Sequence, residues 1–142
     1  MTSIFLLTLL IILVILSGFL SGSETAITAT SKARILYKKK KGSKRAGYVL
    51  NLLDKKDNVI STLLLSNNLV NILASSLATA FFYDLFGVEG IFYATLIMTV
   101  VIVIFAEVLP KTYAINRPNR TALLISPIIY YLNRILFIFV FL

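Results

Sequence analysis

Three asparagines, Asn67, Asn68 and Asn71, lie within five residues of one another in a segment that is otherwise apolar. An amide without a partner in hydrocarbon costs several kcal/mol, so these side chains need polar partners or a bound ligand nearby. Asn67 and Asn71 are four residues apart and share one helix face, whereas Asn68 is rotated from that face by about 100°. We therefore rank Asn67 and Asn71 first as possible ligands, and Asn68 second.

Two other apolar segments carry polar residues toward one end. Ser17 and Ser21, again four apart, lie at the end of the first segment, and Glu107 lies near the end of a later one. Each cluster also has a purely structural interpretation. Small residues such as Gly18 and Gly22 let membrane helices pack closely, asparagines hydrogen-bond across helices, and a glutamate near the end of a span can reach the interface.

Together the clusters supply only hard oxygen atoms, from hydroxyls, amide carbonyls and one carboxylate. Such ligands suit Mg²⁺, Ca²⁺ or Na⁺ and disfavour zinc and copper. Pro110 suggests one more ligand, because its ring supplies no N–H to the carbonyl of Ala106. The candidate metal ligands are Ser17, Ser21, Asn67, Asn71 and Glu107, with Asn68 and the Ala106 backbone carbonyl ranked second.

Two charged residues near the candidate ligands allow other interpretations of this region. Lys111 lies four residues after Glu107, so the two side chains can pair and close the site. Glu24, at the mouth of the first apolar segment, is a second acid, although its position suits a solvated interfacial charge. With one carboxylate in the candidate set, selectivity would rest on ligand number and geometry.

The composition places these residues in a membrane. Of the 142 residues, 58% are hydrophobic and 14% charged, with a mean hydropathy of +0.92, whereas soluble domains carry about 25% charged residues. The length suits one domain, residues 1–142. Because histidine and cysteine are absent from the sequence, Ser-His and Cys-His catalysis and imidazole or thiolate zinc sites are excluded. We predict a protein that is not an enzyme.

The elements that must position the clusters are membrane helices, expected at about Ser3–Leu20, Val59–Tyr83 and Ile91–Leu109. Between the first two, the polar and basic segment 25–58 predicts one or two short helices at the membrane surface, broken near Gly42. The fold class is therefore an all-α membrane protein with three transmembrane helices and juxtamembrane, interfacial helices.

Charge predicts the orientation. Eight of the fourteen basic residues fall within Lys32–Arg45, while the loop with Asp84 and Glu89 has no Lys or Arg. The positive-inside rule then makes the segment 32–56 cytoplasmic and the N-terminus extracellular, in a multi-pass protein of the cell membrane. The basic cluster also predicts contact with anionic lipid headgroups rather than with nucleic acid.

A fourth apolar block, Thr121–Leu142, has two interpretations. Its length allows a crossing, but Pro127 and Asn133–Arg134 interrupt it, and an arginine at mid-bilayer is costly. It can instead lie along the cytoplasmic interface. The sequence ends in "FVFL" with no polar cap, which suggests a part of a longer protein.

Three stretches carry a resemblance to a known family: "SGFLSGSETA" at 17–26, "SNNLVN" at 66–71 and "AEVLPK" at 106–111. Their order and separation resemble the transmembrane domain of the CorC / cyclin M (CNNM) magnesium transporters. The corresponding family patterns are S-G-x-x-S-G-x-E-x-A, G-N-x-L-V-N and G-E-x-x-P-K. Ser66 and Ala106 stand here in place of two glycines.

The resemblance implies a homodimer of three-crossing domains with belt-like juxtamembrane helices, in which Thr121–Leu142 lies at the interface. It implies binding of dehydrated Mg²⁺ by the five first-ranked ligands and export of Mg²⁺ coupled to Na⁺ entry. In the family, cytoplasmic CBS domains follow this region. A small-residue seam of Ala74, Ser75 and Ala78 is our predicted dimer face.

An alternative function is a Mg²⁺-sensing membrane scaffold that regulates another transporter. An intramembrane protease ranks third, because Asp54, Asp57 and Asp84 all lie in polar segments.

Overall fold

In the computed structural model of the protein, the backbone is described for residues 2–141 and the side chains for residues 3–136. Every regular element of this part is helical. The elements are α1 (Thr2–Ala29), α2 (Lys32–Lys40), α3 (Lys44–Asp54), α4 (Lys56–Phe86), α5 (Glu89–Val101), the π-helical segment η1 (Ile102–Val108), α6 (Leu109–Asn116) and α7 (Pro118–Phe141).

Three continuous helices are long and apolar enough to cross a membrane, namely Ser3–Ala29, Lys56–Phe86 and Glu89–Asn116. The third combines α5, η1 and α6. This confirms the predicted class, an all-α membrane protein with three spans and shorter helices beside them. Much of the apolar surface of the spans is exposed in the isolated chain, as expected for helices that face lipid.

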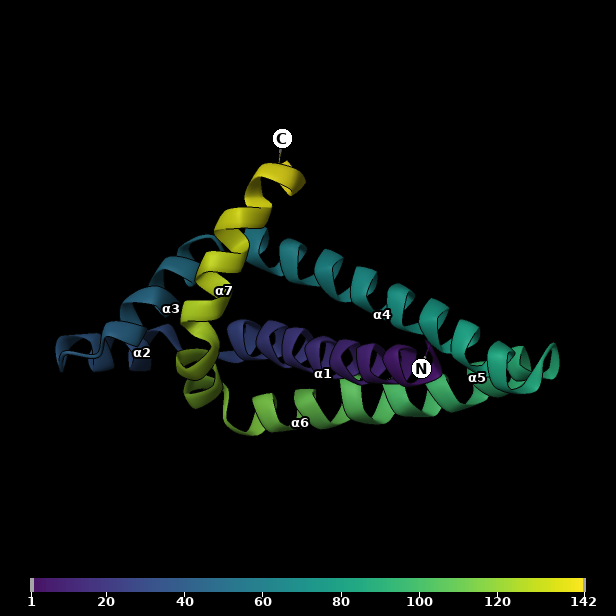
Figure 1. The fold of residues 1–142 in the computed structure, drawn as a ribbon. Helices are drawn as coiled ribbons and strands as arrows, with labels where there is room; N and C mark the ends of the chain where they lie inside the picture. Colours follow the sequence, from purple (N-terminus) through teal and green to yellow (C-terminus); the bar gives the residue numbers. More distant parts are fainter. Residues whose placement is uncertain (1, 142) are drawn as a thin grey trace.

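The first span lies between the other two. Helix α1 packs against α4 on one side and against η1 and α6 on the other, while α4 and α5 meet at a tight turn. That turn contains Gly87 with φ +72°, a left-handed conformation that glycine adopts without strain. Figure 1 shows the three spans side by side, with α2, α3 and α7 gathered at the end remote from this turn.

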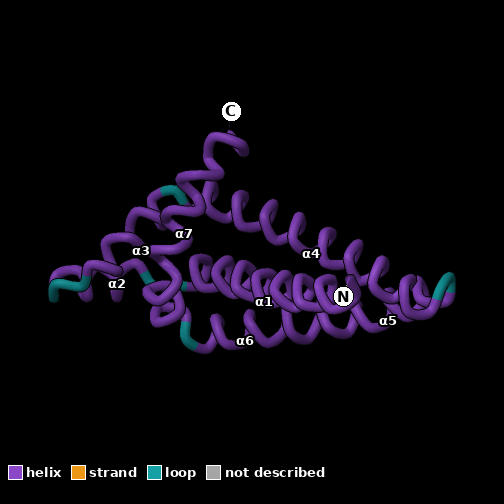
Figure 2. The backbone as a smooth tube through the Cα atoms, in the orientation of Figure 1, coloured by secondary structure: helices purple, strands orange, loops and turns teal. Residues whose placement is uncertain are grey.

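The short helices α2 and α3 form where the sequence predicts a surface segment. Ser31 and Ser43 cap their N-termini through side-chain oxygens that accept from the N–H groups of Arg34 and Ala46. Gly42, with φ +97°, forms the turn between them. The loops in this region are short, as Figure 2 shows.

Helix α7 runs across the end of the bundle rather than along the spans (Figure 1). It packs against α3 and α1 and buries Ala122, Ile125 and Ile129 there. Its tyrosines meet α3, with the ring of Tyr130 centred 5.1 Å from that of Tyr48. A hydrogen bond with Tyr131 raises the pKa of Tyr48 above its ordinary value. The fourth apolar block is therefore a lateral helix in this fold.

Two predicted boundaries were wrong. The first helix extends past Leu20 to Ala29, because its small residues pack against neighbouring helices instead of ending the helix. The third span continues through Pro110 to Asn116, because the π-helical hydrogen bonds of η1 let the helix continue without an N–H from the proline.

The predicted dimer seam was also wrong in part. Ala74 and Ala78 are fully buried within the single chain, on an α4 face that packs against α1 and α5. They cannot form a surface between two copies.

Gly18 tests the close packing of α1 on the third span. A Cβ at Gly18 would lie 3.1 Å from the carbonyl oxygen of Phe105 and 3.2 Å from Cγ of Pro110, whereas one at Gly47 in α3 would meet nothing within 4 Å. We expect Gly18→Ala to lower the free energy of unfolding in detergent by about 1–3 kcal/mol. Gly47→Ala should instead raise it by about 0.5–1 kcal/mol. Stabilisation of both variants would contradict this packing.

Candidate metal site

The centre of the site is a contact between α1 and α4. The hydroxyl of Ser17 donates to Oδ1 of Asn67 at 2.8 Å and also lies in hydrogen-bonding contact with Oδ1 of Asn71. One hydroxyl carries one proton, so it cannot fully satisfy two carbonyl acceptors at once. Three oxygens therefore lie close together and share a single hydrogen. A bound cation would stabilise this arrangement.

The three asparagines differ as their angular positions predict. Asn67 is 8% exposed, Asn71 is half-buried and Asn68 is exposed. Each change of one residue along a helix turns the side chain by about 100°, which places Asn68 on the outer surface of α4. The structure therefore brings Asn67 and Asn71 to the serine face of α1 and leaves Asn68 away from it.

The second serine is buried and has no partner among the described residues. Oγ of Ser21 lies next to the same interface without a hydrogen bond, although buried hydroxyls are nearly always paired. Ser23, two residues later, is satisfied by donating to the carbonyl of Phe19 at 2.7 Å. Since Ser21 is four residues from Ser17, the two hydroxyls share one face of α1.

Next to Gly18, the π-helical segment η1 places backbone oxygen against α1. The N–H of Leu109 donates to the carbonyl of Ile104, five residues back, rather than to that of Phe105. Pro110 has no N–H, so the Phe105 carbonyl has no helical donor left. This carbonyl faces Gly18, as its 3.1 Å distance from a Cβ built there shows.

The sequence reasoning therefore missed Phe105 as a source of free backbone oxygen. It named the Ala106 carbonyl, which does lack its Pro110 donor. The shift by one residue follows from the π-helical register. Pro110 was the one signal in the sequence, and it does not specify that register.

Glu107 belongs to the same η1 segment and is half-buried. Among the described side chains it makes no hydrogen bond or ion pair, so the suggested pairing with Lys111 does not form. The ion pair that the described part shows is at the surface, between Lys32 and Asp54 at 3.9 Å. Glu24 is also half-buried. Its backbone carbonyl accepts a hydrogen bond from the hydroxyl of Thr28, four residues later.

The arrangement can be stated in three parts. Ser17, Asn67 and Asn71 touch, Ser21 has an unpaired hydroxyl one helical turn along α1, and η1, which carries under-bonded carbonyls and Glu107, packs against α1 at Gly18. Every one of these groups offers hard oxygen. No group of three or more Asp, Glu, His or Cys side chains occurs in the described part, so a charge-rich cluster is not the basis of this site.

Comparison with known families accounts for the arrangement of the motifs. The family described as the Cyclin M transmembrane N-terminal domain (CNNM) matches residues 8–142. The chain belongs to this family. The match covers all three spans, the short helices α2 and α3, and α7.

Several curated relatives of this CNNM domain are similar in sequence. It is 40% identical over 131 residues to the UPF0053 inner membrane protein YfjD of Escherichia coli, covering 84% of this chain and 31% of the relative. It is 39% identical over 140 residues to a UPF0053 protein of Haemophilus influenzae, covering 96% and 33% respectively. A chloroplastic DUF21 domain-containing protein of Arabidopsis thaliana, At1g55930, is 31% identical over 131 residues, with 91% and 20% covered. The chain spans about a third of the length of the bacterial relatives.

Removal of the Ser17 hydroxyl tests the central contact. Ser17→Ala leaves the buried amide oxygen of Asn67 and the half-buried one of Asn71 without this donor, and we expect a loss of about 1–3 kcal/mol in the free energy of unfolding. Asn68→Ala, on the exposed side of the same turn of α4, should change it by less than about 0.5 kcal/mol. Unfolding in detergent, followed by circular dichroism, measures both. A Ser17→Ala variant as stable as Asn68→Ala would contradict the contact.

Proposed function

We propose that this CNNM domain binds and transports Mg²⁺ between its membrane helices, as an exporter coupled to Na⁺ entry. The observation that carries the proposal is the convergence of Ser17 with the carbonyl oxygens of Asn67 and Asn71, beside the unpaired hydroxyl of Ser21. These oxygens carry more acceptor lone pairs than there are donor hydrogens to pair with them. A cation supplies the missing positive charge.

The number of oxygens fits a Mg²⁺ ion that has lost its water. Two serine hydroxyls, two amide carbonyls, the Glu107 carboxylate and one backbone carbonyl make about six ligands, the number that Mg²⁺ prefers. The carbonyls of Phe105 and Ala106 are the candidates for the last place, because Pro110 deprives both of a donor. Asn68 drops out of the proposed set because its side chain lies on the exposed surface.

In the proposed mechanism, η1 moves Glu107 toward the ion and away from it. The carboxylate is on a π-helical segment and is not in hydrogen-bonding contact with the serine–asparagine oxygens. A rearrangement of η1 would bring it to a bound ion and take it away again, which is the requirement for release after capture. π-helical segments inside α-helices are frequent at functional sites for this reason.

The charge pattern supports entry from the cytoplasm. The basic residues of α2 and α3 lie at the same end of the bundle as the serine cluster of α1. By the positive-inside rule we propose that this end is cytoplasmic and that the N-terminus is extracellular. We also propose a homodimer, contact of residues Lys32–Arg45 with anionic headgroups, and cytoplasmic CBS domains in the longer protein, on the family resemblance.

Mg²⁺ protection against unfolding tests the binding site. At a Mg²⁺ concentration of 100 Kd, a bound ion adds about 2.7 kcal/mol to the stability of the protein. We expect Asn71→Ala and Glu107→Gln to lose most of this protection, and Asn68→Ala to retain it. Differential scanning fluorimetry across a Mg²⁺ titration gives the three curves. Equal protection in the wild type and in the Asn71 and Glu107 variants would refute the site.

Flux in proteoliposomes separates transport from sensing. A transporter moves Mg²⁺ out of loaded vesicles at a rate that rises with an opposing Na⁺ gradient, and Asn71→Ala slows it at least about tenfold. A Mg²⁺-sensing scaffold would keep the binding and show no flux.

A further inference from the structure

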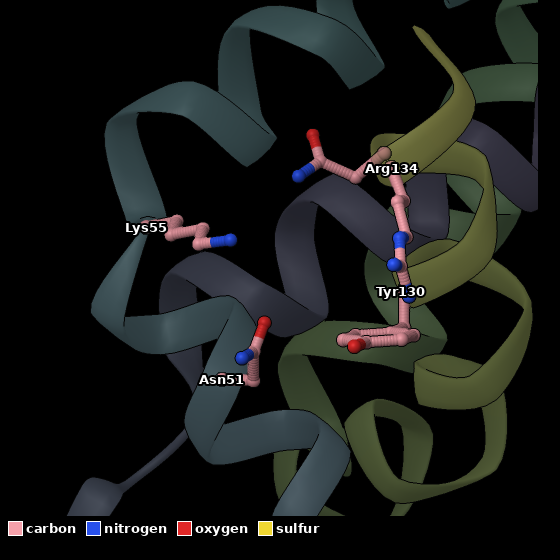
Figure 3. Close-up of a pocket in the computed structure, with 5 residues that line it drawn as sticks. Asn51, Lys55, Tyr130 and Arg134 are labelled. Carbon is pink, nitrogen blue, oxygen red and sulfur yellow. The ribbon is translucent and has the colours of Figure 1, made fainter. Parts of the chain in front are cut away.

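A polar cavity lies outside the candidate metal site, between the α3–α4 junction and α7. It has a volume of about 320 Å³ and is lined by Asn51, Lys55, Tyr130, Asn133 and Arg134. Figure 3 shows Asn51 and Lys55 on one side of it and Tyr130 and Arg134 on the other, with the Lys55 side chain extending across toward α7. Two of the five lining side chains are cationic and the other three are neutral, so the cavity has a net positive charge.

The cavity also contains an unsatisfied amide. Asn133 is 7% exposed, and its Oδ1 has no hydrogen-bond partner among the described residues. A buried amide oxygen accepts hydrogen bonds and is costly when unpaired, so a ligand that places a hydroxyl here, such as the glycerol of a phospholipid headgroup, would stabilise it. No acidic side chain lines the cavity. Asp54 and Asp57 line a neighbouring hollow, which shares Lys55 with the cavity and also contains Lys56 and Asn58.

The exposed face of α7 shows at what depth in the membrane the cavity opens. Leu124, Ile128, Tyr131 and Ile135 follow each other at intervals of four, three and four residues, and each is more than half exposed. They form one exposed stripe, opposite the buried residues Ala122, Ile125 and Ile129, and Tyr131 at its edge also meets Tyr48 of α3. Arg134 precedes Ile135 and is turned about 100° from the stripe.

Helix α7 therefore has lipid-facing, cationic and buried sectors in order around its axis. A lateral helix of this kind lies at the level of the headgroups, with its apolar stripe toward the acyl chains. Tyr130 and Arg134, four residues apart, share the sector between the stripe and the buried face. The cavity is thus open at the level where phosphate groups of lipids lie.

We propose that this cavity binds a phosphate group, supplied by the headgroup of an anionic phospholipid. Arg134 and Lys55 would hold the phosphate oxygens from two sides, since guanidinium and ammonium groups both form charge-assisted hydrogen bonds with phosphate. The amides of Asn51 and Asn133 and the Tyr130 hydroxyl complete the polar lining. The acyl chains would lie along the apolar stripe of α7, so that one lipid joins α7 to the start of α4.

This site differs from the basic segment at Lys32–Arg45. The basic side chains of that segment are exposed on α2 and at the start of α3, where they attract anionic membrane surfaces in general. The cavity instead gathers polar side chains from α3, the α3–α4 junction and α7, and predicts saturable binding of one molecule. It is also independent of the Mg²⁺ proposal, because it shares no residue with the metal site.

The test uses the protein in a neutral detergent with three probes, namely dioctanoyl phosphatidylglycerol, glycerophosphoglycerol without acyl chains, and inorganic phosphate. Melting temperature and microscale thermophoresis report binding. We expect saturable binding of the phospholipid, and at least about tenfold weaker binding in the double variant Lys55→Gln/Arg134→Gln. Lys39→Gln/Lys40→Gln removes the same charge from α2 and should bind as the wild type does.

The outcomes separate the sources of the phosphate. Tight binding of the phospholipid alone assigns a lipid, whereas equal binding of all three probes assigns a soluble phosphate to the same cavity. The cavity variant carries substitutions of exposed side chains, and its melting temperature without probe shows that it folds. Binding that is absent for all three probes, or equally weakened in both double variants, would overturn the proposal.

Discussion

The close approach of α1 to its two neighbours is the contact on which the rest of the structure depends. Ser17, Gly18, Ser21 and Gly22 form one face of α1 with almost no side-chain volume. Because two of these residues are glycines, the third span can bring backbone atoms and the Pro110 ring directly against α1. Because the other two are serines, the same face meets α4 through oxygen. A helix with Leu or Val at these positions would separate the three spans and leave the asparagines of α4 in lipid, where an unpaired amide costs several kcal/mol.

Much of the fold follows from hydropathy and charge. The three spans and the short surface helices could be predicted, since bilayer thickness fixes span length. The fourth block was open between a crossing and a lateral helix, and only the family resemblance favoured the lateral position. The boundaries could not. Leu20 and Leu109 mark the ends of apolar sequence, but helices continue beyond them because backbone hydrogen bonding continues wherever neighbouring helices cover the chain. The prediction of the dimer face was wrong in part for a related reason. Ala74 and Ala78 pack within the chain, and the size of a residue does not indicate which neighbour it contacts.

The candidate site was predictable to the level of the helix face. Spacing of four residues paired Ser17 with Ser21 and Asn67 with Asn71, and the angular offset set Asn68 aside. The contact between the two pairs required tertiary structure, as did the free carbonyl of Phe105. A proline predicts that some carbonyl loses its donor, but the π-helical register decides which one. Glu107 was named as a candidate ligand from its chemistry alone, and no spacing rule specifies its distance from the other oxygens.

The π-helical segment gives the third span a property that a regular helix lacks. It holds an additional residue within its turns, so the helical parts before and after it are out of phase by about 100°. If the wide turn moves by one position along the chain, the residues that it passes rotate about the axis while both ends of the span keep their places in the membrane. Glu107 and the carbonyls beside it lie within this segment. The span can therefore change which oxygens it presents to α1 by local rotation, with no tilt or translation of the helix as a whole.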